Sequence, residues 1–222
     1  MLIAEDLLLL AFDDTEGKPV SGVHNLDQAV AGALLLELTL RGRVDVTGEA
    51  DEGRAGRIVL RDATPVGEAE LDGALEALAE KEGAKPKDAV NRLAKDGPVD
   101  RLLSGLADRG VLKREDRKVL KLFPVTRWPA ADCRHEEQLR TELHRVLVEE
   151  AEPDERTAAV VALLVATKSV RHAFPTDDPQ LTQKRAEQVA EGNWGSDAVR
   201  KAIDEVTAAV MVAVMAAVVT TS

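Results

Sequence analysis

The stretch from Ala29 to Val46, AVAGALLLELTLRGRVDV, decides the fold. Its leucines are too closely spaced to form a single apolar stripe, so the stretch predicts a helix that is buried on most of its circumference. Gly42 follows the apolar run at the position where a glycine in the left-handed conformation often ends a helix. Beyond it, Val44 and Val46 alternate with charged residues, which predicts a short, half-buried strand.

One acidic residue interrupts the apolar run of this helix. Glu37 precedes Arg41 by four residues, which is the favoured order for an ion pair on one helix face. We interpret the pair as structural. If Glu37 is buried, removal of only one partner should be costly, because the other charge then stays buried without its counter-ion.

The rest of the chain has a mainly helical pattern. Apolar periodicity and capping residues predict helices over residues 2–12, 70–81, 86–95, 99–109, 131–150, 154–172 and 180–191, and a last helix that contains the apolar run 206–219. One β-hairpin is predicted from residues 43–46 and 57–61, and a second from residues 111–114 and 118–122 with its turn at 115–117. We therefore expect a mainly α fold over residues 1–222: a single helical domain with buried central apolar helices, amphipathic helices around them and two short β-hairpins.

The composition limits the classes of protein that fit. Of the 222 residues, 45% are hydrophobic and only 2% are aromatic, so the core must be built from Leu, Val and Ala. The formal net charge of −11 argues against broad electrostatic adhesion to nucleic acid or to anionic lipid. Cys133 is the single cysteine, which excludes an internal disulfide and fits a reducing compartment.

Two apolar segments bear on the location of the protein. The first, near the start, shows no secretory signal, because Glu5 and Asp6 interrupt it and no basic region precedes it. The second, 206–219, is shorter than the roughly 20 residues that cross a bilayer, so we interpret it as a core helix. We expect a cytoplasmic protein, with peripheral attachment to the inner face of the membrane as an open option.

The motifs of the common catalytic sites are missing. The sequence has no glycine-rich phosphate loop, no GxSxG and no HExxH. Cys133, His135 and His144 come nearest to a metal site, but they supply three ligands where a zinc site needs four. We therefore expect no enzyme activity, no cofactor and no metal.

The second predicted hairpin carries a basic stretch that is conspicuous on an acidic chain. Five basic residues stand within nine positions: Lys113, Arg114, Arg117, Lys118 and Lys121. Three interpretations stay open, namely lysines that protect an exposed strand edge, a patch that binds anions at a membrane surface, and the wing of a nucleic-acid-binding domain. A helix followed by a hairpin resembles half of a winged helix, but helix 99–109 has only two basic residues. Nucleic acid is therefore not an expected partner.

Several blocks of sequence, in this order, resemble the Golgi phosphoprotein 3 family. The segment LLLELTLRGRVDV at 34–46 is similar to the family's signature, in which an apolar helix ending in Glu-Leu-x-Leu-Arg-Gly-Arg precedes a strand. The other similar blocks are EDLLLL at 5–10 with DTEG at 14–17, TPVG at 64–67 with LDGAL at 71–75, LADRGVL at 106–112, Trp128-Pro129, and the helix pair through Ala173-Phe174. Together they run over nearly the whole chain. The composition, rich in Ala, Val, Arg and Asp, suggests a bacterial member.

The resemblance implies a mainly α-helical domain and a non-enzymatic adaptor that associates peripherally with membranes. Family members in eukaryotes bind phosphatidylinositol 4-phosphate at Golgi membranes and help to retain glycosyltransferases. Their headgroup pocket uses one tryptophan and three arginines. The corresponding positions in this sequence carry none of these residues; they are Gly22, Ala31, Asp96 and Val99.

Our leading hypothesis is a peripheral membrane or adaptor-type protein that recognises the headgroup of an anionic phospholipid. The candidate residues are Lys113, Arg114, Arg117 and Lys118 of the hairpin, and Arg92, Lys95 and Arg101, which flank the replaced pocket positions. The alternative is a soluble protein-interaction scaffold without lipid binding, and a less favoured one is a winged-helix-like regulator. A protein partner and a homo-oligomer are both compatible with the sequence.

Overall fold

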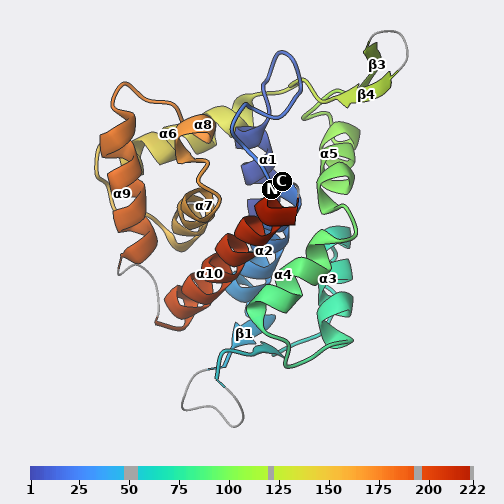
Figure 1. Ribbon diagram of the computed structural model, residues 1–222, viewed down its shortest axis with the longest axis vertical. Coiled ribbons are helices and arrows are strands. Elements are labelled where there is room, and N and C mark those ends of the chain that lie inside the picture. Colours follow the sequence, from blue (N-terminus) through green and yellow to red (C-terminus); the bar gives the residue numbers. More distant parts are fainter. Residues whose placement is uncertain (48–54, 120–122, 193–196, 221–222) are drawn as a thin grey trace.

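The helix predicted from residues 29–46 lies at the centre of the protein. The computed structural model describes residues 1–47, 55–119, 123–192 and 197–220 (Figure 1). In it, α2 (Leu26–Leu40) is buried from Ala29 to Leu38 and packs against α1, α3, α4, α5, α7 and α10. The crowded leucines therefore form a helix that is enclosed by other helices, as predicted.

The end of α2 has the geometry that its glycine predicts. Gly42 has a φ of +66° and donates its N–H to the carbonyl of Thr39, 2.8 Å away. The N–H of Arg43 donates to the carbonyl of Leu38 at 2.9 Å. These two bonds make a Schellman motif, which satisfies carbonyls that the helix leaves open at its end.

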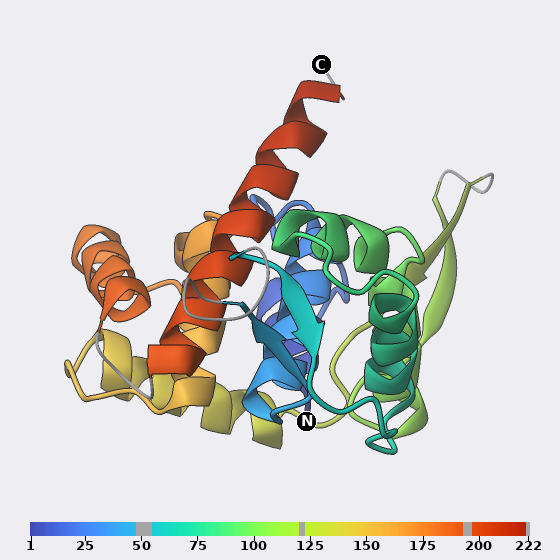
Figure 2. The same ribbon diagram turned by 90° about the horizontal axis from the view of Figure 1, so that it is seen from below.

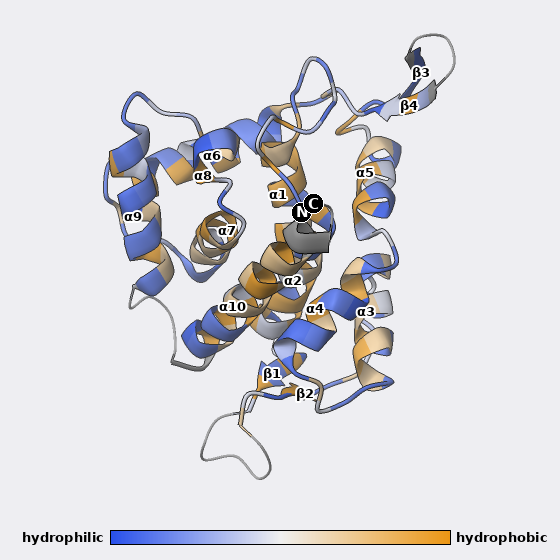
Figure 3. Cartoon of the chain, viewed as in Figure 1, coloured by the Kyte–Doolittle hydropathy of each residue, from blue (hydrophilic) through white to orange (hydrophobic). Residues whose placement is uncertain are grey.

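The other helices surround α2 and confirm a mainly α architecture. They are α1 (Ile3–Ala11), α3 (Ala69–Ala79), α4 (Pro86–Ala94), α5 (Pro98–Asp108), α6 (Arg134–Leu147), α7 (Glu155–Ala166), α8 (Val170–Ala173), α9 (Pro179–Glu191) and α10 (Asp197–Thr220). In Figure 1, α3, α4 and α5 lie on one side of α2, and α6, α8 and α9 lie on the other. Apolar residues concentrate on the central helices α1, α2, α7 and α10, whereas α9 is largely hydrophilic (Figure 3).

Two antiparallel hairpins complete the fold, as predicted. β1 (Val44–Val46) pairs with β2 (Ile58–Leu60), and β3 (Glu115–Val119) pairs with β4 (Phe123–Arg127). The predicted boundaries of the second hairpin are wrong, because the expected turn at 115–117 lies inside β3. Leu112 instead forms an isolated bridge with Ala130, and the N–H of Lys113 donates to the carbonyl of Pro129 at 2.8 Å. Residues 112–113 therefore pair with residues 129–130, and the ladder of the hairpin begins later in the chain, at Glu115.

The helix predicted over 154–172 is interrupted. Lys168 adopts a left-handed conformation with a φ of +55°, and its N–H donates to Val165 O at 3.0 Å. The N–H of Ser169 donates to Leu164 O at 2.9 Å. A lysine thus occupies the position that glycine usually takes in a Schellman motif, and the chain breaks into α7 and α8.

The last helix departs from the expected core helix in one respect. Val206, Val210 and Ala213 are buried against the rest of the protein, but Met211 and Met215 are exposed. Figure 2 shows the end of α10 projecting beyond the body. Only one face of the apolar run therefore belongs to the core. The polar loop at 48–54 and Lys121 lie outside the described residues.

Candidate functional site

The β3–β4 hairpin carries the basic residues singled out from the sequence. Lys113 and Arg114 lie immediately before β3, and Arg117 and Lys118 lie within it. All four side chains are exposed. The hairpin projects from the side of the molecule next to α5 (Figures 1 and 2).

The two arginines are engaged by neighbouring acidic and aromatic groups. The guanidinium of Arg114 lies over the indole of buried Trp128, 5.8 Å from the ring centroid, and its Nε is 3.4 Å from Asp116 Oδ1. Nη2 of Arg117 is 2.5 Å from Glu115 Oε2. Both ion pairs are solvent-exposed, so each contributes little to stability and is readily exchanged for another anion.

The two lysines have no such partner. Among the described residues, neither Lys113 nor Lys118 forms an ion pair with a carboxylate. Because side chains alternate along a strand, Lys118 points to the face opposite Arg117. The hairpin therefore offers positive charge on both of its faces, with two free ammonium groups.

The three flanking candidates lie apart from the hairpin and near carboxylates. Arg92 of α4 is paired with Glu80, and Lys95 is exposed just after α4. Nη2 of Arg101 in α5 is 2.9 Å from Glu70 Oε2. The hydrogen bond that Arg101 donates to the Glu70 carboxylate raises the pKa of the guanidinium, although burial opposes the rise. Arg92 and Arg101 are thus already neutralised by neighbouring acidic side chains.

Gly22, the residue that the sequence comparison predicts at the position of the pocket tryptophan, lies against another side chain. Gly22 has a φ of +90°, and a Cβ atom at this residue would overlap the imidazole of His172. His172 comes from α8, far away in the sequence, and its ring lies against the Gly22 backbone. The space beside this backbone is therefore occupied by histidine, and Gly22 accommodates it because it has no side chain.

Ala31, Asp96 and Val99, which the sequence analysis predicts at the positions of the pocket arginines, have no basic side chain. Ala31 is fully buried in α2. The N–H of Val99 donates a hydrogen bond to the carboxylate of Asp27. Burial raises the pKa of Asp27, the Val99 bond opposes the rise, and Asp100 adds to it. Asp96 adds a further carboxylate just before α5. This region favours a cation over a phosphate.

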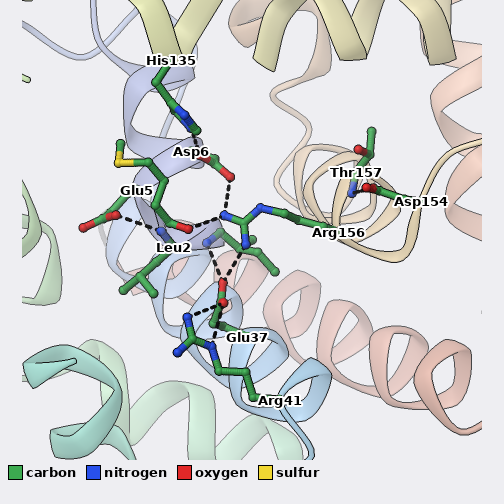
Figure 4. Close-up of polar contacts among 11 residues, drawn as sticks. Leu2, Glu5, Asp6, Glu37, Arg41, His135, Asp154, Arg156 and Thr157 are labelled. Atoms are coloured by element: carbon green, nitrogen blue, oxygen red, sulfur yellow. Dashed lines mark hydrogen bonds and ion pairs between the residues drawn. The ribbon is translucent and has the colours of Figure 1, made fainter. Parts of the chain in front are cut away.

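The ion pair between Glu37 and Arg41 is one part of a larger buried network (Figure 4). Glu37 Oε1 lies 3.0 Å from Nη2 of Arg41, and Glu37 Oε2 accepts the N–H of Ile3 at 2.8 Å and a bond from Arg156 at 3.1 Å. The carboxylate of α2 thus caps the start of α1, where the helix dipole favours negative charge. It also joins α1 and α2 to α7.

Two acidic residues of α1 belong to the same network. Nη2 of Arg156 is 2.6 Å from Asp6 Oδ2, and Nε2 of His135 is 2.7 Å from Asp6 Oδ1. Glu5 accepts the N–H of Leu2 at 2.8 Å and pairs with Arg109. Burial lowers the pKa of the Arg156 guanidinium, but Asp6 and Glu37 outweigh this and raise it.

The network links three helices of the core through charged side chains. Each of its three carboxylates is buried and paired with a basic side chain, which offsets the cost of burying the charge. Sequence analysis missed the partners Arg109, His135 and Arg156. The available signal was the pair of acidic residues in the apolar run 2–12, since buried carboxylates require partners.

A second buried carboxylate lies at the start of α6. Glu136 is 3% exposed, and its Oε1 is 2.6 Å from Nε of Arg140. Burial raises the pKa of Glu136 from 4.5 to about 7; Arg140 opposes the rise, and the carboxylate of Asp14 adds to it. Arg140 also donates to the carbonyl of Ala173 at 3.0 Å, which ties α6 to the end of α8.

A groove of about 700 Å³ runs between α6, α9 and the segment 174–178. Its apolar side chains include Leu147, Val148, Phe174 and Leu181, of which Val148 and Leu181 are exposed. His144 and Arg145 lie at its rim. Its charged lining is mixed, with Arg140 and Arg145 against three acidic residues, and its exposed apolar side chains suit an apolar segment of another molecule.

Neither a metal site nor a membrane span is found in the part of the chain that the structure describes. No group of three or more His, Cys, Asp or Glu side chains among these residues could hold a metal ion. No helix among them has both the length and the apolar character that crossing a bilayer requires.

Comparison with known proteins gives the family. The model of the family described as Golgi phosphoprotein 3 (GPP34) matches residues 3–206. Vacuolar protein sorting-associated protein 74 of Eremothecium gossypii is 31% identical over 167 residues, which cover 67% of this chain and 49% of the relative. The protein of the same name from Schizosaccharomyces pombe is 24% identical over 163 residues, or 66% of this chain and 48% of the relative. The chain thus spans about half the length of the curated relatives it matches, and it belongs to the Golgi phosphoprotein 3 (GPP34) family.

Proposed function

We propose that this protein is a non-enzymatic, adaptor-type protein that binds peripherally to membranes containing anionic lipid. Family membership supports the adaptor role, and two relatives carry names that refer to protein sorting. The observation that carries the lipid part is the projecting β3–β4 hairpin, on which Lys113 and Lys118 present free ammonium groups. A cytoplasmic location follows from this role.

The hairpin is suited to bulk negative charge rather than to one headgroup. Lysine acts toward phosphate as a flexible point charge, and the exposed arginines Arg114 and Arg117 can exchange their weak carboxylate partners for phosphate. A selective pocket for phosphatidylinositol 4-phosphate is not supported, because Gly22 is covered by His172 and Asp27 lies beside Val99. Arg92, Lys95 and Arg101 are secondary candidates for the same reason: they lie in acidic surroundings.

Vesicle co-sedimentation tests this proposal. We expect the protein to bind vesicles of phosphatidylcholine mixed with phosphatidylglycerol, and to bind more weakly at physiological than at low salt, because screening weakens exposed charge interactions. Charge reversal in Lys113→Glu/Lys118→Glu should reduce this binding at least about tenfold, since four units of charge change at the surface and each basic residue contributes about 1 kcal/mol. Vesicles with phosphatidylinositol 4-phosphate at matched total charge should bind no better.

The matched control is Lys81→Glu/Lys87→Glu, which changes the charge by the same amount at two exposed lysines near α3 and in α4. It should bind as the wild type does, apart from the general effect of net charge. Equal losses in the two variants would remove the hairpin as the contact site. Stronger, salt-resistant binding to phosphatidylinositol 4-phosphate would instead mean a rebuilt headgroup pocket.

The groove between α6 and α9 favours a second candidate function, a protein-interaction scaffold without lipid binding. Its exposed Val148 and Leu181 suit an apolar segment of a partner protein. In that case wild-type protein binds no vesicle, and Leu181→Gln abolishes capture of a partner while Lys113→Glu leaves it unchanged. The partner could also be a second copy of this chain. In that case the molecular mass measured in solution should rise with protein concentration.

A nucleic-acid-binding regulator is the least supported candidate. α5 precedes the hairpin as in a winged helix, but Arg101 and Arg109 are paired with Glu70 and Glu5. A gel shift with duplex DNA at low salt checks this directly, because non-specific binding is strongest there. A flat titration removes the candidate.

A further inference from the structure

Large exposed apolar side chains gather on the outer face of α10. Met211, Val212 and Met215 are 42%, 48% and 53% exposed, whereas Val206, Val210 and Ala213 on the opposite face are buried. The chain has three methionines, and the two that follow Met1 both lie on this exposed stripe. Methionine is flexible and polarisable, which suits a surface that is covered by something else.

The sequence of α10 beyond this stripe stays uncharged. Residues 207–222 include no charged side chain, in a chain of which 31% is charged. Ala213 is the last residue of α10 that the described side chains show to be buried, and the helix continues to Thr220. A helix that lacks charged residues on every side is normally buried. Because this one projects from the protein, we expect its end to contact another apolar surface.

The position of this helix end points to a lipid surface. Figure 2 shows the end of α10 and the β3–β4 hairpin extending to the same side of the molecule. One element brings apolar surface, and the other brings the cations Lys113, Arg114, Arg117 and Lys118. Stable attachment to a membrane usually takes two such signals, an inserted apolar group and a basic patch.

A second copy of the chain would cover the helix end less completely. Residues 208–220 form a strip roughly 20 Å long and 10 Å wide, on the order of 200 Å² on each copy. A stable interface buries about 800 Å² per partner. A bilayer, by contrast, surrounds an inserted helix on every side and needs no complementary shape.

We infer that the projecting end of α10 inserts into the membrane interface and is the apolar half of a two-part anchor, with the β3–β4 hairpin as its electrostatic half. The inference rests on the proposed membrane binding and adds the inserted element. The segment from Val214 to Thr220 rises roughly 10 Å, which matches the 5–10 Å depth at which interfacial helices lie. It reaches the boundary between headgroups and acyl chains and does not cross the bilayer.

The test compares two apolar-to-polar variants of the full chain. Met211→Gln/Met215→Gln changes exposed side chains and keeps a similar helix propensity, so the fold is retained. Each side chain of this size that enters lipid strengthens partitioning by roughly tenfold. We expect this variant to lose at least about tenfold in co-sedimentation with phosphatidylcholine–phosphatidylglycerol vesicles, at low and at physiological salt. The matched control, Leu181→Gln on α9, removes an equally exposed apolar group elsewhere and should bind as the wild type does.

A direct readout of insertion completes the experiment. An environment-sensitive fluorophore on Met215→Cys, in a Cys133→Ser background, should shift its emission to the blue when vesicles are added, while the same label at Leu181→Cys should not. Wild-type binding that is unchanged in Met211→Gln/Met215→Gln overturns this inference and leaves the proposed function standing. Wild-type protein that binds neither the vesicles with phosphatidylglycerol nor those with phosphatidylinositol 4-phosphate overturns both this inference and the proposed function. A methionine variant that changes the oligomeric mass in solution assigns the stripe to a second copy instead.

Discussion

Arg156 of α7 lies 2.6 Å from the carboxylate of Asp6 in α1, across 150 positions of sequence. The same guanidinium reaches Glu37 of α2 at 3.1 Å and the carbonyl of Met1 at 2.8 Å. One side chain of α7 therefore contacts both α1 and the last turn of α2. Asp6 is 2% and Glu37 5% exposed, so Arg156 neutralises buried charge at both carboxylates, in addition to the pair of Glu37 with Arg41.

Removal of Arg156 should destabilise the fold. Arg156→Ala leaves two buried carboxylates without their shared counter-ion, so we expect the free energy of unfolding to fall by about 3 kcal/mol. Urea denaturation measures it. The control Arg145→Ala breaks an exposed pair with Glu142 and should cost less than about 1 kcal/mol. Equal costs for the two variants would mean that the network contributes no more than a surface pair.

Glu136 should make the stability depend on pH near neutrality. Its pKa is raised from 4.5 to about 7 in the folded state, so the folded protein holds the proton more tightly than the unfolded chain. The free energy of unfolding should therefore fall as the pH rises from 4.5 to 7, and this contribution should level off above 7. In Glu136→Gln this fall is absent.

Urea denaturation at a series of pH values between 5 and 8, roughly spanning the titration, isolates the effect as the difference between wild type and Glu136→Gln. Glu137→Gln changes the exposed neighbour and should leave the wild-type pH dependence in place. A parallel shift of both variants would contradict the assignment to Glu136.

Gly32 should be required where α10 crosses α2. A Cβ atom at Gly32 would overlap Cγ2 of buried Val210 and lie 3.2 Å from Leu163 Cδ2. Gly32→Ala should therefore destabilise by about 1–3 kcal/mol, although alanine is the better helix former. Gly73→Ala in α3 meets no neighbouring atom within 4 Å and should stabilise by about 0.5–1 kcal/mol. Thermal unfolding of both variants checks the contrast, and added Val210→Ala should recover part of the Gly32→Ala loss.

Gly22 and His172 should be coupled. Gly22→Ala places a side chain at a φ of +90° and against the imidazole, so it should cost more than the 1–2 kcal/mol or so of a strained left-handed residue. His172→Ala should relieve the overlap but not the backbone strain. A double-mutant cycle measures the coupling. Additive effects would show that His172 does not occupy the space beside Gly22.

Local patterns of sequence predicted much of this fold. The leucine-rich run, Gly42 and the spacing of Glu37 and Arg41 each act within one helix and its cap. They predicted α2, its end at a left-handed glycine and the ion pair of Glu37 with Arg41. The basic composition of the hairpin could be predicted in the same way.

The pairing within that hairpin could not be predicted, because it depends on register. Leu112 and Lys113 pair with Ala130 and Pro129, and this choice decides that Glu115 faces Arg117 within β3. An isolated strand carries no record of its partner. The same register places Lys118 opposite Pro124, which offers it no carboxylate.

The sequence by itself therefore determined the helices, their caps and the distribution of charge, because these arise from bonds between near neighbours in the chain. Only the tertiary structure decided that Arg156 neutralises Asp6 and Glu37, that His172 covers Gly22, and that Met211 and Met215 stay outside the core. Each of these depends on which helix faces pack together and exclude water. That is a property of the packed molecule, in which residues far apart in sequence become neighbours.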